Sequence, residues 1–180
     1  MPASPVPTPT EEELLAFGTL LARCGKIIES EISGSSMGET LPAGTRIRIQ
    51  PLPAGDYAVG QIVAFVRGGT IFAHRIAYRT KQGLLTRGDN HSWCDLPVPA
   101  DAVLGLVTDC HINGQWRKFA DIPQGSPKQP WRNRVLETAV RIGMRLDIRL
   151  ARRISRALKR LARVRRNLIS DISPDASARP

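Results

Sequence analysis

Short runs of β-branched and apolar residues, separated by glycines and prolines, occupy the middle of this chain. The apolar period is two in residues 45–50, 61–67, 70–78, 83–87 and 103–112. Short alternating runs bounded by turn residues predict antiparallel strands. Gly68-Gly69 and Asn113-Gly114 predict two tight hairpin turns. We therefore predict a mainly β fold, a compact antiparallel β domain built as a partly open barrel or a pair of small sheets.

Helical patterns flank this β region on both sides. Thr10 precedes three glutamates and predicts a short N-terminal helix whose apolar spacing continues to about residue 28. Residues 132–168 predict one long basic amphipathic helix or a helix pair, with Gly143 as a candidate break. A single helix of that length would span roughly 50 Å, whereas a body of about 100 residues is roughly 35 Å across. We therefore expect that the β domain alone cannot bury the apolar stripe.

Charge separates the chain into a neutral body and a basic C-terminal segment. Residues 132–166 hold 13 of the 26 Lys and Arg but only two of the 16 Asp and Glu, while residues 1–131 hold 12 of each sign. We predict a disordered lead-in at 1–12, the β domain with its helix at 13–120, and a linker at 121–131. The basic helical segment follows at 132–168 and a disordered tail at 169–180.

Cysteine usage and hydropathy indicate a cytoplasmic protein. Three cysteines are an odd number without the spacing of a disulfide framework, which favours reduced thiols. The N-terminus lacks the pattern of a secretory signal, and no apolar run approaches the roughly 18 residues of a spanning helix. We therefore expect a cytoplasmic location, with the chain either soluble or peripheral on the inner face of the membrane.

Three segments of the β region carry residues suited to nucleophilic catalysis. Ser36 lies beside Met37 in a Gly/Ser turn, His74 lies in a predicted strand, and Asp89 and Asp95 follow it. A serine hydroxyl needs an adjacent base, and that base needs a third group to hold its tautomer. These residues therefore predict a serine nucleophile, a histidine base and an orienting aspartate.

The same segments resemble the signal peptidase I family. The matching boxes read GSSM at 34–37, AHRI at 73–76 and GDN at 88–90, with GLV at 105–107 matching a closing strand. Histidine as the base resembles the endoplasmic-reticulum and archaeal members. The resemblance implies the signal peptidase/LexA type of β domain and a serine endopeptidase that cleaves a leader or precursor peptide beside small residues. It implies Ser36 as nucleophile, with its backbone N–H at the oxyanion, His74 as base and Asp95 as orienter, without a metal or cofactor.

Several alternatives stay open at this point. Asp89 is a second candidate orienter, although aspartate in such a turn more often shapes the loop. Glu39 replaces the usual proline of the family, and Gly34 carries no side chain to donate to an oxyanion. The chain could instead be a non-catalytic β module docked on membrane or nucleic acid, or a LexA-like regulator that cleaves its own Cys24–Gly25 bond.

The partners that we expect are a peptide or protein substrate and an anionic membrane surface. The membrane contact is assigned to the basic segment at 132–168, because basic amphipathic helices lie in membrane interfaces. Nucleic acid is less favoured, since no aromatic residues are interleaved with the arginines to stack on bases. The spacing of His91, Cys94, Cys110 and His111 is not that of a zinc site.

Overall fold

A computed structural model describes residues 9–52, 57–119 and 131–172, with side chains described except at 22–23, 131–136 and 162–172. Its helices are α1 (Glu11–Arg23), α2 (Trp131–Leu146) and α3 (Ile148–Ile172). The eight strands form one antiparallel sheet in the order β1-β2-β7-β3-β4-β5-β6, and β8 pairs with β7. The strands are β1 (Ile28–Glu31), β2 (Arg46–Gln50), β3 (Ile62–Arg67), β4 (Thr70–Thr80), β5 (Gly83–Arg87), β6 (Val98–Pro99), β7 (Val103–Ile112) and β8 (Gln115–Lys118).

The mainly β class is confirmed, and the five predicted strands are all present with closely similar limits. The hairpin turn between β3 and β4 has positive φ at Gly68 and Gly69, 57° and 71°, a conformation that glycine adopts without steric cost. Asn113 and Gly114, also at positive φ, turn β7 into β8. The sequence prediction missed β1 and β6, which have only four and two residues. Runs this short carry too little periodicity to be recognised.

Helix α1 begins with a capping box. The Thr10 hydroxyl accepts the backbone N–H of Glu13 at 3.2 Å, and the Glu13 carboxylate accepts the backbone N–H of Thr10 at 2.7 Å. The helix therefore starts at Glu11, inside the predicted lead-in. It ends at Arg23, followed by Gly25 at φ 62°, so the predicted continuation to residue 28 is wrong. The apolar residue at position 28 starts strand β1 instead.

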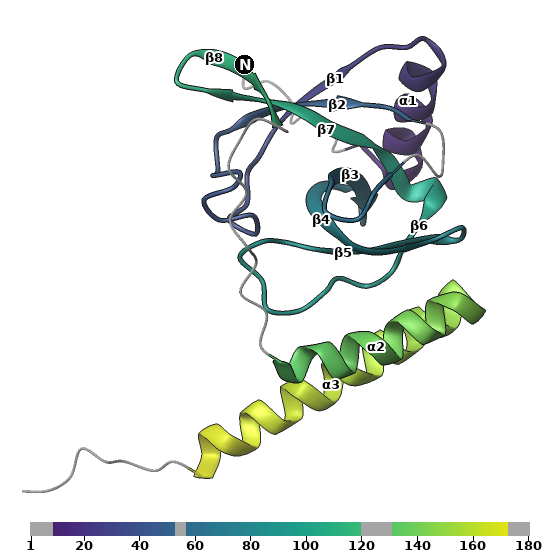
Figure 1. The fold of residues 1–180 in the computed structure, drawn as a ribbon, viewed down its shortest axis with the longest axis vertical. Helices are drawn as coiled ribbons and strands as arrows, with labels where there is room; N and C mark the ends of the chain where they lie inside the picture. Colours follow the sequence, from purple (N-terminus) through teal and green to yellow (C-terminus); the bar gives the residue numbers. More distant parts are fainter. Residues whose placement is uncertain (1–8, 53–56, 120–130, 173–180) are drawn as a thin grey trace, which may run out of the picture.

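Two hydrophobic clusters fill the β domain. The larger one joins buried residues of β2, β3 and β7 with Leu14 and Leu15 of α1, and includes Met37 beside Ser36. The second lies around Phe65, Ile76 and Leu84 on β3, β4 and β5. Figure 1 shows β1, β2 and β7 lying above β5, with β3 and β4 between them. The polar loops that carry the candidate site are thus anchored by a packed sheet.

The basic segment folds as a hairpin of two helices and not as one long helix. The break lies at Asp147, whose carboxylate accepts the backbone N–H of Leu150 at 3.1 Å and caps α3. Gly143 remains inside α2, where a Cβ atom would lie 3.1 Å from Cα of Ala151. The predicted break at Gly143 is therefore wrong, and this glycine lets the two helices approach closely. Helix α3 continues to Ile172, beyond the predicted end of the segment at 168.

This hairpin covers part of the apolar stripe that is too long for the β domain alone. Ala151, Ile154 and Leu158 of α3 pack with α2 and with Leu85 of β5, and Figure 1 shows both helices running beneath that strand. Helix α2 supplies part of the cover because the chain folds back, so the β domain does not bury the stripe alone. Four large apolar residues of the described part of the hairpin remain exposed: Ile142, Leu146, Leu150 and Leu161. Over the described ranges, no helix is long and apolar enough to cross a membrane.

Candidate active site

Three predicted residues from separate elements meet at one point. Ser36 lies in the loop between β1 and β2, His74 in β4, and Asp95 in the loop between β5 and β6. Nε2 of His74 lies 2.8 Å from Oγ of Ser36, and Nδ1 lies 2.6 Å from Oδ2 of Asp95. An ionised carboxylate only accepts hydrogen bonds, so neutral His74 carries its proton on Nδ1 and leaves Nε2 free to accept. The imidazole is thus oriented to take a proton from the Ser36 hydroxyl.

The sheet holds the His74 ring in a largely apolar surrounding. The side chain is only 3% exposed, and the Phe65 and Phe72 rings lie 5.9 Å from the imidazole centroid. His91, which is exposed, meets the same ring edge-on at 6.0 Å. Packing on several sides limits rotation of His74 and keeps its two nitrogens aimed at Ser36 and Asp95.

The Asp95 carboxylate is held by strand β5 as well as by His74. The hydroxyl of Thr86, which is fully buried, donates to Oδ2 of Asp95 at 2.7 Å, and the backbone N–H of Asp95 donates to the Thr86 carbonyl at 2.7 Å. Burial raises the pKa of the Asp95 carboxyl, but His74, Thr86 and the nearby Arg67 cation outweigh burial and leave that pKa lowered. Asp95 is therefore held as the anion that an orienting group requires.

Asp89 is engaged elsewhere. Its two oxygens accept Nε and Nη2 of Arg75 at 2.9 and 2.6 Å, and Oδ2 also accepts the Thr40 hydroxyl at 2.7 Å. The Arg75 and Asp89 side chains are each 10% exposed, so the pair is almost buried. Of the two candidate aspartates, the structure brings Asp95 to His74 and uses Asp89 to hold the turn.

That turn supports the serine directly. The backbone N–H of Asn90 donates to the Ser36 carbonyl at 2.9 Å, and the Asn90 amide donates to the Ser35 carbonyl at 3.2 Å. A Cβ atom at Gly88 would lie 2.4 Å from the Ser36 carbonyl oxygen, so only glycine permits this approach. The Met37 side chain, 1% exposed, anchors the other side of the serine turn in the core. The turn at 88–90 and the serine turn at 34–37 therefore hold each other in place through these contacts.

The sequence prediction missed Thr40, Arg75 and Thr86. The sequence could have revealed Arg75, because a charged residue next to His74 in a buried strand needs an oppositely charged partner. Asp89 is that partner. Thr86 had no such signal, since a threonine in a strand is ordinary until its neighbours are known. Gly34 and Glu39, where the chain departs from the family pattern, are both exposed.

The described part of the chain holds no cluster of metal-ligating side chains and no disulfide. No group of three or more His, Cys, Asp or Glu side chains is placed there to hold a metal ion, and Cys24, Cys94 and Cys110 are free thiols. The Cys94 thiol donates to the Glu137 carboxylate at 3.1 Å. Neither the known protein-family models nor the curated proteins contain a match to this chain.

Proposed function

We propose that this protein is a serine endopeptidase of the signal peptidase type, with a β domain of the signal peptidase/LexA kind. The observation that carries the proposal is the placement of His74, which contacts the Ser36 hydroxyl through one nitrogen and the Asp95 carboxylate through the other. A serine, a base and an orienting carboxylate in this contact order are the working parts of acyl transfer. The substrate is a peptide or protein whose scissile bond reaches Ser36.

In the first step Ser36 Oγ attacks the carbonyl carbon of the scissile peptide bond. The hydroxyl proton passes to Nε2 of His74, and the resulting imidazolium is stabilised by Asp95. The backbone N–H of Ser36 donates to the developing oxyanion, since Gly34 offers no side chain for this role. Collapse of the tetrahedral intermediate breaks the C–N bond, and His74 returns the proton to the leaving amine.

In the second step water hydrolyses the acyl-enzyme. Nε2 of His74 takes a proton from the attacking water, and the oxygen of that water bonds to the acyl carbon. The bond to Ser36 Oγ then breaks, and the proton on His74 returns to the serine. The products are the restored Ser36 hydroxyl and a carboxylic acid, which loses its proton to solvent, so the step needs no metal, cofactor or oxidant.

The proposal is tested by incubating the purified full-length chain with a diverse synthetic peptide library and detecting cleavage by mass spectrometry. The wild type should cleave, while Ser36→Ala and His74→Ala should each lose cleavage, and the double variant should be no worse because the residues act as a unit. Ser92→Ala, an exposed serine in the nearby loop, is the matched control and should remain active. Equal cleavage by wild type and Ser36→Ala, or none by the folded wild type, would reject the proposal.

We further propose that the α2–α3 hairpin holds the enzyme on anionic lipid. Ile142, Leu146 and Leu150, spaced by four, are 56%, 69% and 41% exposed around the turn of the hairpin. Exposed arginines flank them at positions 145, 149 and 153. Apolar side chains edged by cations suit a membrane interface, where each basic residue contributes about 1 kcal/mol on an anionic surface. Of the predicted stripe, Leu150 belongs to this surface, whereas Ile154 and Leu158 pack against the protein.

Flotation with liposomes tests the lipid contact. The wild type should float with vesicles containing phosphatidylserine and not with phosphatidylcholine alone, and Ile142→Asp plus Leu146→Asp should reduce flotation at least tenfold. Phe17→Asp plus Leu20→Asp is the matched control, because it makes the same charge change on exposed apolar residues of α1. If the hairpin variant floats as well as the control, the lipid proposal fails. If that variant still binds duplex DNA and salt weakens the binding, nucleic acid would then be favoured as the partner of the hairpin.

A further inference from the structure

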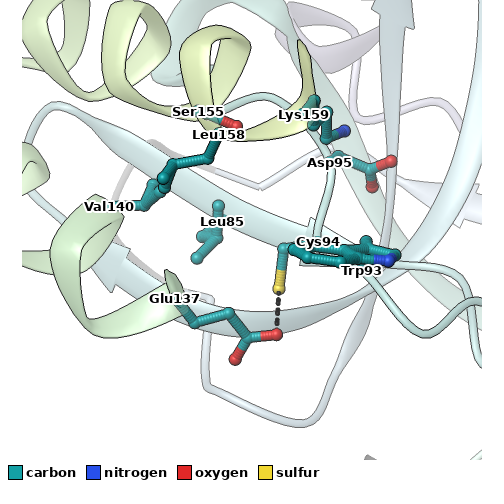
Figure 2. A pocket seen from close by; sticks show the side chains of 9 residues that line it. All are labelled: Leu85, Trp93, Cys94, Asp95, Glu137, Val140, Ser155, Leu158 and Lys159. Carbon is teal, nitrogen blue, oxygen red and sulfur yellow. Dashed lines mark hydrogen bonds between the residues drawn. The ribbon is translucent and has the colours of Figure 1, made fainter. Parts of the chain in front are cut away.

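The C-terminal hairpin touches the β domain at the strand and the loop that hold the Asp95 carboxylate. Leu85 of β5 and Cys94 of the Asp95 loop are buried in one cluster with Val140 and Met144 of α2 and Ala151 of α3. Lys159 of α3 lines the same small cavity as Asp95, Cys94 and Glu137 (Figure 2). A segment that the sequence presents as a basic appendage therefore packs behind the proposed triad.

Strand β5 links the hairpin to Asp95, because its side chains alternate between the two faces of the strand. All five of its residues are buried, and successive side chains of a strand point to opposite faces. Leu85 and Arg87 face the hairpin, where Leu85 packs on α2 and Arg87 lies 3.4 Å from the Glu137 carboxylate. Thr86, between them, faces the other way and donates to Asp95.

A single carboxylate ties together the two segments that make the Thr86–Asp95 contact. Oε1 of Glu137 accepts the Cys94 thiol at 3.1 Å, and the same oxygen lies 3.4 Å from Nη1 of Arg87. Cys94 immediately precedes Asp95, and Arg87 immediately follows Thr86. Glu137 is only 5% exposed, and Figure 2 shows its side chain pointing at Cys94 beneath the loop. The Glu137 carboxylate thus holds the residue next to Thr86 and the residue next to Asp95. In this way it fixes both partners of the Thr86–Asp95 hydrogen bond.

The hairpin also adds charge of both signs near the triad. Glu137 on α2 is negative, and Lys159 on α3 is a cation attracted by Asp95, although desolvation lowers the pKa of its ammonium. The other charged or titratable groups near His74 and Asp95 include Arg67 on β3 and His91 in the loop. Since imidazolium formation on His74 responds to nearby charges, opposite charges on the two helices act on it in opposite directions.

We infer that the α2–α3 hairpin is part of the catalytic unit, with Glu137 and Thr86 as positioning residues that hold Asp95 against His74. The inference rests on the proposed function. It means that hydrolysis depends on docking of the C-terminal segment, even though Ser36, His74 and Asp95 all lie in the β domain. A contact that shifts the hairpin, such as a membrane surface on its outer face, would then alter turnover without touching the triad.

The test measures kcat, KM and the pH–rate profile of variants of the whole chain. The acid limb of that profile is the part where cleavage falls as His74 gains a proton, and its midpoint is the quantity compared. Glu137→Gln should lower kcat about tenfold with little change in KM, since misplacement of catalytic groups acts on the chemical step. It should also move the acid limb a few tenths of a pH unit lower, because a negative charge near the imidazole is lost. Lys159→Met should move the limb in the opposite direction. A smaller amount of folded protein would lower the rate at every pH, but it would not move the midpoint of the acid limb in either variant.

Two further comparisons separate positioning from stability. Thr86→Val should lower kcat more than Thr86→Ser, which keeps the hydroxyl. Val140→Ala, a buried residue of the same cluster without a polar link to the loop, should lower the melting temperature and leave the acid limb in place. The inference is overturned if Glu137→Gln and Lys159→Met lose activity only in proportion to their loss of melting temperature, while the midpoint of the acid limb of the pH–rate profile stays unchanged.

A readout without turnover keeps this inference distinct from the proposed function. The chain has three histidines, so the His74 imidazole can be assigned and titrated by NMR in a Ser36→Ala background. Opposite displacements of its titration midpoint in Glu137→Gln and Lys159→Met would support the coupling even if no peptide were cleaved. Identical titration curves in all three proteins would refute the coupling while leaving a measured peptidase activity untouched.

Discussion

Replacing Asp95 by asparagine removes the charge behind His74 and nearly preserves the shape of the site. Oδ2 of Asp95 accepts both His74 at 2.6 Å and Thr86 at 2.7 Å. An asparagine can keep both contacts only with its oxygen in that position. The opposite orientation points its NH₂ group at Nδ1 and moves the imidazole proton to Nε2, where it blocks proton transfer from Ser36.

Even the favourable orientation loses charge stabilisation of the imidazolium. Opposite unit charges about 4 Å apart interact by about 4 kcal/mol at an effective dielectric of 20, which corresponds to about a thousand-fold in rate at about 1.4 kcal/mol per tenfold. We therefore expect Asp95→Asn to lower kcat about a thousand-fold, and further if the proton moves to Nε2. The melting temperature should change little, because the side-chain volume and the packing are retained.

Asp89→Asn is the paired comparison. It breaks the nearly buried contact with Arg75, which leaves that cation uncompensated and costs about 3–5 kcal/mol of unfolding free energy. Single-turnover cleavage and thermal melting of both variants provide the assay. A fully active Asp95→Asn protein beside an inactive but equally stable Asp89→Asn protein would refute the assignment of Asp95 as orienter.

Three other predictions concern the serine turn, the base and the thiols. Gly88→Ala should lower cleavage at least about a hundred-fold, because its Cβ would lie 2.4 Å from the Ser36 carbonyl oxygen and displace the nucleophile; unchanged kcat would contradict this packing. The cleavage rate should climb from acid to a plateau as His74 loses its proton, because only a neutral imidazole can accept the Ser36 proton; a profile still rising steeply above about pH 9 would exclude His74 as base. Burial and then Glu137 raise the pKa of the Cys94 thiol, so iodoacetamide at neutral pH should modify exposed Cys24 first; mass spectrometry showing Cys94 modified equally fast would mean that the hairpin does not cover it.

The sequence by itself determined the parts of this protein that depend on local pattern. Period-two runs between glycines located strands β2, β3, β4, β5 and β7, and the capping pattern at Thr10 located the start of α1. Ser36, His74 and Asp95 could be selected as candidates because residue types suited to acyl transfer stood in recognisable surroundings. Short strands such as β1 and β6 escaped, because two to four residues cannot establish a period.

Tertiary structure decided the choices that depend on distant segments. Asp89 and Asp95 lie six residues apart in one loop, and only the positions of Arg75 and Thr86 on neighbouring strands determine which carboxylate reaches His74. The basic segment likewise has the periodicity of a long amphipathic helix. Its apolar stripe is partly covered because the chain turns at Asp147 and packs α3 against α2 and β5, while Leu150 and Leu161 stay exposed. Periodicity specifies which face of a helix is apolar, but it does not specify what covers that face, since the covering residues come from elsewhere in the chain.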